Sequence, residues 1–217
     1  MPSSLPDDNR IKTAVITGGH SFDVPGIYAV FRSMPEVDFY PQPLEDFIAD
    51  AGNVRAHYDV LVFFNMHTAM PDDRTREVLE QLGNTEQGIV VLHHALLDHG
   101  EWDLWSDICG IGDRTITDFE HSVSLQMSVA DNDHPVMRGI HDFEMIDETY
   151  VMDEPGEGSD ILLTTDHPRS MNNIAWAKQF KKARAFCFQS GHDNQTYVDP
   201  NFRKILEQGI HWVAGKS

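Results

Sequence analysis

Three short apolar runs constrain the fold of this chain more than any other feature of the sequence. They are Thr13–Thr17, Tyr58–Phe64 and Gly88–Leu92, and polar or helix-patterned segments separate them. Strands that are apolar along their whole length are typical of a parallel sheet with helices on both faces. The sequence therefore predicts an α/β fold in which these runs are interior strands.

The intervening segments have the spacing and end signals of helices. Apolar positions in Val24–Met34 recur as on one helix face, and Pro71–Leu82 begins with aspartates and ends before Gly83. Val37–Tyr40 is predicted to be a further, weaker strand, and Pro200–Trp212 a closing amphipathic helix. Alternation of strands and helices favours an open, doubly wound sheet.

The pattern changes after about residue 120 to alternating apolar and polar residues. Ser122–Val129 is predicted to be a half-exposed antiparallel strand, followed by shorter strands at 161–165, 173–177 and 183–188. We therefore expect a three-layer, flavodoxin-like, mostly parallel sheet with a β-rich insertion. Residues 1–10 are polar and predicted to be a disordered lead, and residues 11–217 a single domain.

The net charge, the first residues and the cysteines exclude some partners, locations and metal modules. The formal net charge of −19 argues against binding to phosphate backbones or anionic lipid, so neither nucleic acid nor a membrane is an expected partner. The first residues lack the basic and apolar regions of a signal peptide, and we expect a cytoplasmic protein. Cys109 and Cys187 lie far apart without CxxC spacing, which excludes a cysteine-rich zinc module.

Histidines follow the ends of several predicted strands. The chain has twelve, and His20, His67, the pair His93 and His94, and His192 each come directly after a predicted strand. In open α/β sheets, ligands bind outside the carboxyl ends of the strands. We therefore expect His20, His93, His94 and His192 to surround one pocket.

Such imidazoles can bind a divalent metal, move protons or donate hydrogen bonds to a polyol. For proton transfer we predict His94, His192 and Glu148 as the catalytic residues. Alternatively, Asp147 and Glu148 form a solvated acidic turn and have no catalytic role.

The remaining site predictions concern binding. Substrate contacts are expected from His20, His93, Trp102 and Asp193, because an indole can lie against the apolar face of a sugar ring. If the site holds a metal such as zinc or manganese, His20, His93 and His192 are the candidate ligands. Which cofactor is required, if any, stays open.

Several ordered motifs resemble one protein family. They are Gly18-Gly19-His20, Gly88–His94 with Trp102, the string from His134-Pro135 to Asp147–Tyr150, Ala183–Asp193, and Gly209-Ile210-x-Trp212. Over residues 11–215 this set is similar to the ThuA-like, trehalose-utilisation family. The resemblance implies the flavodoxin-like fold of class I glutamine amidotransferases, and a role with trehalose-like disaccharides or their keto derivatives.

The likeness to amidotransferases ends at the nucleophile. Those enzymes carry a cysteine in a Gly-x-Cys-x-Gly elbow, whereas this chain has Val91-Leu92-His93-His94-Ala95, with His94 at about the nucleophile's place. Glutaminase activity is therefore not expected. Two classes remain: an enzyme acting on a sugar as a hydrolase, lyase or isomerase, and a non-catalytic carbohydrate-binding or complex-forming protein. A homodimer is predicted from the apolar C-terminal helix and nine methionines.

Overall fold

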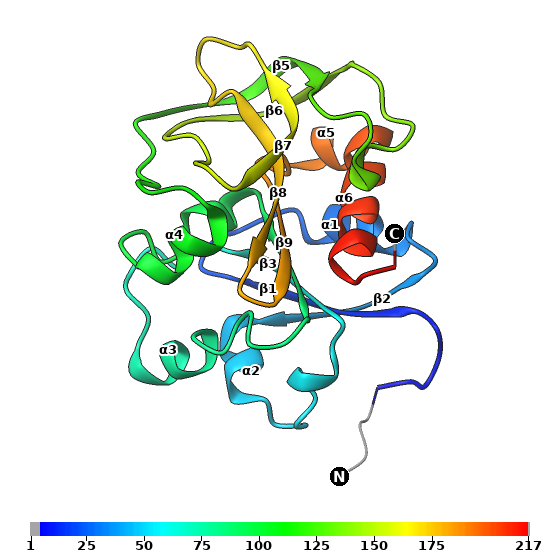
Figure 1. The fold of residues 1–217 in the computed structure, drawn as a ribbon, viewed down its shortest axis with the longest axis vertical. Coiled ribbons are helices and arrows are strands. Elements are labelled where there is room, and N and C mark those ends of the chain that lie inside the picture. The colour runs from blue at the N-terminus through cyan, green and yellow to red at the C-terminus, as the bar shows by residue number, and fades with distance from the viewer. Residues whose placement is uncertain (1–4, 217) are drawn as a thin grey trace.

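A nine-stranded mixed sheet forms the centre of the protein in a computed structural model that describes residues 5–216 (Figure 1). The strand order is β2-β1-β3-β4-β9-β8-β7-β5-β6. The strands are β1 (Ile11–Gly18), β2 (Val37–Pro43), β3 (Val60–Asn65), β4 (Gly88–Leu92), β5 (Asp118–Val129), β6 (Phe143–Val151), β7 (Ser159–Thr165), β8 (Asn173–Phe180) and β9 (Ala183–Phe188).

The five strands β2, β1, β3, β4 and β9 run parallel. Val62 of β3 pairs with Val15 of β1, and Val90 of β4 pairs with Phe186 of β9. All residues of β3 and β4 are buried, as expected for strands covered on both faces. The predicted α/β class with three apolar interior strands is confirmed.

Helices cover both faces of the parallel half (Figure 1). One face packs against residues of α1, α5 and α6, and the other against residues of α2, α3 and α4. The three layers follow from these two separate apolar cores. The helices are α1 (Val24–Arg32), α2 (Leu44–Ala49), α3 (Asp73–Leu79), α4 (Asp103–Cys109), α5 (Asn194–Tyr197) and α6 (Pro200–Val213), with 3-10 helices η1 (Arg55–His57), η2 (His93–Leu97) and η3 (Pro135–Met137).

The predicted β-rich insertion extends the same sheet. From β9, the strands β8, β7, β5 and β6 are paired antiparallel, so β9 joins the two halves. The far strand β6 returns to the parallel half, because Tyr150 contacts His93 after β4 and Asp147 contacts Gly191 after β9. This return brings β6 over the carboxyl ends of β4 and β9.

Two details of the predicted layout are corrected. Asp147 and Glu148 do not form a solvated acidic turn, since both lie buried within β6. The apolar face of α6, on which the dimer prediction partly rested, is buried against the sheet through residues such as Phe202, Leu206 and Ile210. That helix face therefore packs within the core of the chain and gives no support to a dimer interface. The homodimer stays a prediction.

Two further predictions concern the disordered lead at residues 1–10 and the absence of a membrane partner. Residues 1–4 lie outside the described part, and residues 5–10 precede β1 with Arg10 paired to Asp8 (2.9 Å) and Asp38 (3.1 Å). Within residues 5–216, no helix combines the length and apolar character needed to cross a bilayer.

Candidate active site

A cavity of about 300 Å³ lies at the carboxyl ends of the parallel strands, where β6 approaches them. Residues that follow β1, β3, β4 and β9 line it together with residues of β5 and β6. Its apolar wall includes Met66, Leu97, Ile116 and Phe119. Its polar wall consists of His20, His93, His94, His121, His192, Glu148 and Tyr150.

Four of these histidines are those that the sequence pattern assigns to one pocket. The turn after β1 reaches this edge because Gly19 has φ +72°, and a Cβ there would lie 2.2 Å from the carbonyl oxygen of Met66. Only glycine permits so close an approach. His20 follows it and its ring lies 4.9 Å from that of His94.

Glu148 contacts three imidazoles. One carboxylate oxygen, Oε2, lies 3.1 Å from Nε2 of His93 and 3.2 Å from Nδ1 of His192. The other, Oε1, lies 3.0 Å from Nδ1 of His121. The Glu148 side chain is only 8% exposed, so these contacts replace most of the water that an ionised carboxylate would otherwise bind.

Strand alternation separates the two acidic neighbours of β6. Asp147 accepts hydrogen bonds from the backbone nitrogens of Gly191 (3.0 Å) and His192 (3.1 Å), and from the Thr196 hydroxyl (2.7 Å). Glu148 and Tyr150 instead contact His93. Asp147 therefore positions the loop after β9, while Glu148 lines the cavity.

His93 occupies the sharp turn between β4 and η2. It has φ +53°, a left-handed conformation that is rare for a residue with a side chain. In strand-to-helix elbows, the residue at the strained position is the one presented to the substrate. The expectation that His94 takes the nucleophile's place is therefore corrected: the elbow residue is His93.

The hydrogen bonds of His93 determine its tautomer. Nδ1 lies 2.7 Å from the carbonyl oxygen of Gln189, and because a carbonyl only accepts, Nδ1 carries the proton. Nε2 lies 3.1 Å from Oε2 of Glu148 and 3.0 Å from the Tyr150 hydroxyl. It donates to the carboxylate only when the ring carries a second proton, and in the neutral ring its lone pair accepts from the Tyr150 hydroxyl. Burial raises the pKa of Tyr150 well above its ordinary value, so its hydroxyl stays protonated.

Glu148 and His192 form a charged pair. Burial alone would raise the pKa of Glu148, but hydrogen bonds from His192 and His93 outweigh it and hold that pKa well below 4.5. The hydrogen bond to Glu148 raises the pKa of His192 above 6.5. With no metal bound, an ionised carboxylate therefore lies beside an imidazole that readily holds a proton.

His94 is held neutral. Its Nε2 lies 3.3 Å from the carbonyl oxygen of Phe64, and its ring packs 4.4 Å from that of Phe64. Burial, followed by the neighbouring His93 and His20, lowers the pKa of His94 to about 2. This neutral imidazole at the cavity wall can accept or donate a hydrogen bond.

Trp102 and Asp193 do not line the cavity. Trp102 is buried at the start of α4, with its ring 5.7 Å from that of His99. Asp193 caps α5 by accepting a hydrogen bond from the backbone nitrogen of Gln195 at 2.8 Å. The structure thus separates both from the other residues predicted to contact substrate.

Sequence reasoning missed His121 and Tyr150. His121 lies one residue before the strand predicted at Ser122–Val129, next to a bulge between Glu120 and Val123. Tyr150 lies in β6, which was not predicted. A strand pattern at Phe143–Val151 would have placed Glu148 and Tyr150 on one face, but the adjacent acidic residues obscured it.

His67, which also follows a parallel strand, belongs to a separate buried cluster. Its backbone nitrogen donates to Asp98, whose carboxylate also accepts from Nδ2 of Asn65 at 2.6 Å. Burial raises the pKa of Asp98. Nearby, the Arg114 guanidinium donates to the carbonyl oxygens of Leu96, Asp98, His99, Gly100 and Trp102. This cluster stabilises the chain between η2 and α4.

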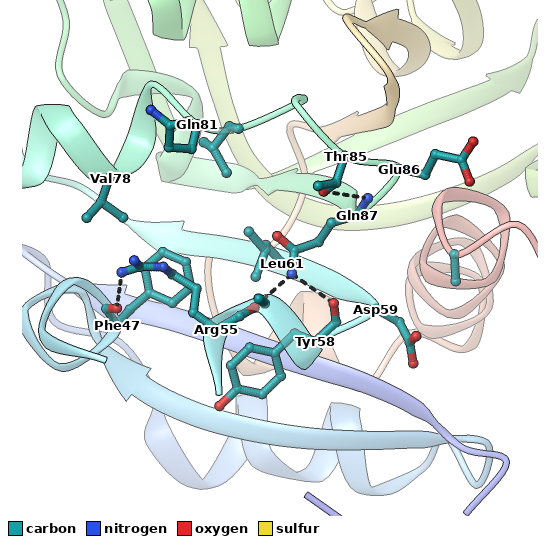
Figure 2. A pocket seen from close by; sticks show the side chains of 13 residues that line it. Phe47, Arg55, Tyr58, Asp59, Leu61, Val78, Gln81, Thr85, Glu86 and Gln87 are labelled. Atoms are coloured by element: carbon teal, nitrogen blue, oxygen red, sulfur yellow. Dashed lines mark hydrogen bonds between the residues drawn. The ribbon is translucent and has the colours of Figure 1, made fainter. Parts of the chain in front are cut away.

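A larger cavity, of about 460 Å³, lies at the opposite edge of the sheet beside the amino ends of β3 and β4. Figure 2 shows two of its polar side chains bonded to nearby backbone: Nε2 of Gln87 donates to the carbonyl oxygens of Arg55 (2.9 Å) and Tyr58 (2.8 Å), and Arg55 donates to that of Phe47 (3.1 Å). Its lining includes neither histidine nor cysteine. The histidine-lined cavity is therefore the better candidate for chemistry.

No thiol lines the histidine-lined cavity. Cys109 and Cys187 are both fully buried in the core that contains α4, and burial raises the pKa of Cys187 well above its ordinary value. A reactive cysteine needs exposure and a lowered pKa. The described residues of this cavity thus lack the nucleophile of a glutaminase.

Comparisons with known proteins agree with this fold. It is similar to that of ThuA-like proteins from Parabacteroides merdae (TM-score 0.75, 22% identity, covering 94% of this chain and 90% of that one) and Bacteroides uniformis (TM-score 0.73, 17% identity, 98% and 95%). A GMP synthase component from Thermoplasma acidophilum is also similar (TM-score 0.59, 11% identity, 96% of each chain). No curated protein matches the sequence.

The family match is extensive. The ThuA family model, described as trehalose utilisation, matches residues 45–213. This range includes all of the cavity's polar residues except His20. The fold is that of class I glutamine amidotransferases, as the sequence motifs imply. On this match the chain belongs to the ThuA, or trehalose utilisation, family.

Proposed function

We propose that this protein is an enzyme of carbohydrate metabolism that transfers protons at a hydroxyl or carbonyl group of a disaccharide or keto-sugar. The observation that carries the proposal is the buried Glu148 carboxylate in contact with three imidazoles at a cavity of ligand size. The family's description as trehalose utilisation supports a role in carbohydrate metabolism.

The proton-transfer roles follow from the electrostatics of the site. His192 is 23% exposed and its pKa is raised by its hydrogen bond to Glu148, so it serves as a general acid. Glu148 orients the ring and stabilises its charged form. His94, which burial keeps neutral, serves as a hydrogen-bonding group for a second substrate oxygen.

An exposed aromatic ring supports a carbohydrate ligand. Phe119 of β5 lines the cavity and is 52% exposed, which is unusual for a large apolar side chain. Aromatic rings pack well against the apolar C–H face of a sugar ring. We therefore assign to Phe119 the stacking role that the sequence pattern indicated for Trp102.

The proposal is tested with the purified chain and a panel of disaccharides and keto-sugars. We expect turnover of at least one, and Glu148→Gln to lower kcat by about 100-fold or more, because proton-transfer groups contribute roughly 10²–10⁴-fold. Glu144→Gln is the matched control, since Glu144 lies on the same strand with an exposed carboxylate.

Two other results would count against catalysis. Sugars that raise the melting temperature without being converted would favour the alternative, a non-catalytic carbohydrate-binding protein. Equal kcat for Glu148→Gln and the wild type would remove Glu148 from the mechanism. A cytoplasmic location and a homodimer remain proposals from the sequence, and light scattering at micromolar concentration tests the dimer.

A further inference from the structure

We infer that His93, Glu148 and His192 form a binding site for one divalent transition-metal ion such as Zn²⁺ or Mn²⁺. Each offers one ligand atom, and the three atoms lie within 4.8 Å of one another. The inference deepens the proposed function by assigning a cofactor to the same cavity, and it revises the role of His192, whose Nδ1 would bind the ion instead of carrying the proton of a general acid. It rests on geometry that is present whether or not the substrate is a sugar.

The distances suit a metal ion. Metal–ligand bonds of about 2.0–2.1 Å at tetrahedral angles place neighbouring ligand atoms about 3.3–3.4 Å apart. Oε2 of Glu148 lies 3.1 Å from Nε2 of His93 and 3.2 Å from Nδ1 of His192. Both nitrogens contact the same oxygen, so a small shift of the side chains would make room for an ion bound to all three atoms.

The outer contacts fix His93 and Glu148 in the form that binds metal. Nδ1 of His93 donates to the Gln189 carbonyl, which leaves the Nε2 lone pair for the ion. His121 contacts Oε1 of Glu148, which leaves Oε2 free. A histidine ligand that donates its other N–H to a carbonyl, and a carboxylate ligand held by hydrogen bonds, are typical of metal centres.

The backbone brings the third ligand into place. Gly191 has φ +136°, and a Cβ there would lie 3.2 Å from the Cβ of His93. This close approach holds His192 beside His93, together with the hydrogen bonds that the backbone nitrogens of Gly191 and His192 donate to Asp147. The loop therefore depends on glycine at this position.

Two nitrogens and one oxygen favour a transition metal over Ca²⁺ or Mg²⁺, which prefer oxygen ligands. Three protein ligands leave coordination positions for water and a substrate oxygen on the cavity side. His20, a ligand candidate from the sequence, contacts the His94 ring and is not among the three.

The binding test uses full-length protein without a histidine tag, stripped of metal by a chelator and then dialysed. Isothermal titration with Zn²⁺ and with Mn²⁺ measures stoichiometry and affinity. We expect one ion per chain for at least one metal. Co²⁺ supplies a second readout, because visible absorption bands report its coordination by nitrogen and oxygen ligands in the site.

Variants locate the ion. We expect His192→Gln and Glu148→Gln each to weaken binding by more than about 100-fold, since loss of outer-shell partners alone costs about 10–100-fold. His211→Gln is the matched control, because His211 is 22% exposed, against 23% for His192, and also lies near a glutamate. Since His192 is half-buried, its variant is the one least prone to unfold.

Two results would overturn the inference: no binding of either metal by the stripped protein, or undiminished affinity in both His192→Gln and Glu148→Gln. Failure of the proposed function is distinguishable. If metal-stripped protein converts a sugar but binds no metal, the proposed enzymatic function stands and the metal site is rejected. If the protein binds Zn²⁺ or Mn²⁺ tightly at these residues but converts no sugar, the metal site stands and the proposed enzymatic function is rejected.

Discussion

Asp147 and His192 are joined by a hydrogen bond in which the backbone nitrogen of His192 donates to Oδ1 of Asp147 at 3.1 Å. The same carboxylate accepts from the backbone nitrogen of Gly191 and the Thr196 hydroxyl. Asp147 is therefore a positioning residue that sets where the His192 ring lies relative to Glu148. It acts through the backbone without lining the cavity.

Replacing Asp147 with asparagine tests this role. Asp147→Asn turns one acceptor into a donor facing a backbone N–H, so we expect a loss of about 1–3 kcal/mol in the free energy of unfolding. Turnover should fall at least tenfold while KM changes little. Asp199→Asn is the control, because asparagine caps a helix as well as aspartate does. Unchanged kcat in Asp147→Asn would contradict the positioning role.

Phe119 should affect binding more than stability. Because its side chain is 52% exposed, Phe119→Ala removes little buried surface, and we expect the melting temperature to change by only a few degrees. Loss of ring stacking should raise KM for the sugar about tenfold, equivalent to roughly 1.4 kcal/mol. Ile146→Ala, at a 41% exposed apolar residue on β6, is the control. Equal KM values in all three proteins would exclude stacking.

His94 should affect both activity and stability. The sequence predicts that His94→Ala abolishes turnover with little change in melting temperature, but the ring is 3% exposed and packs against Phe64. Truncating a buried side chain costs about 2–4 kcal/mol, which for a chain of this size lowers the melting temperature by about 5–15 °C. Calorimetry and kinetics measured together test this. Full turnover by the folded variant would make His94 purely structural.

The pair of Glu148 and His192 gives the metal-free protein a pH signature. The lowered pKa of Glu148 stabilises the fold above about pH 4.5, and this contribution is lost as pH falls through that lowered pKa. The raised pKa of His192 stabilises the fold below pH 6.5, and this contribution is lost as pH rises through that raised pKa.

We therefore expect the difference in melting temperature between wild type and Glu148→Gln to be largest between pH 4.5 and 6.5. It should shrink as the pH rises through the raised pKa of His192. Calorimetry in chelator across this range measures the difference for both proteins. A difference that grows from pH 6 to pH 9 would contradict the pairing.

The parallel half of the fold was predictable because its strands are buried on both faces. Such strands, as in Val60–Asn65, need apolar residues at every position and so stand out locally in the sequence. The histidines that follow them were predictable for the same reason, since the fold class fixes which strand ends share an edge.

The residues that the antiparallel strands β5 and β6 bring to the cavity were not predictable in the same way. Asp147 and Glu148 are adjacent acidic residues, which locally favour a turn, yet they are buried because partners such as His93 and His192 come from segments more than 40 residues away. His121 likewise reaches the cavity through a bulge whose position no local pattern indicates. Contacts between distant segments therefore decided the site.

The position of β9 between β4 and β8 sets the order in which the molecule can be completed during synthesis. Ala183–Phe188 is the last strand of the chain, yet it lies in the middle of the sheet. Until it emerges from the ribosome, the apolar strand β4 has an open edge, which is prone to pairing with other chains. His192 follows four residues later, so the cavity can form only when the sheet closes, and a nascent chain stopped before β9 cannot be active.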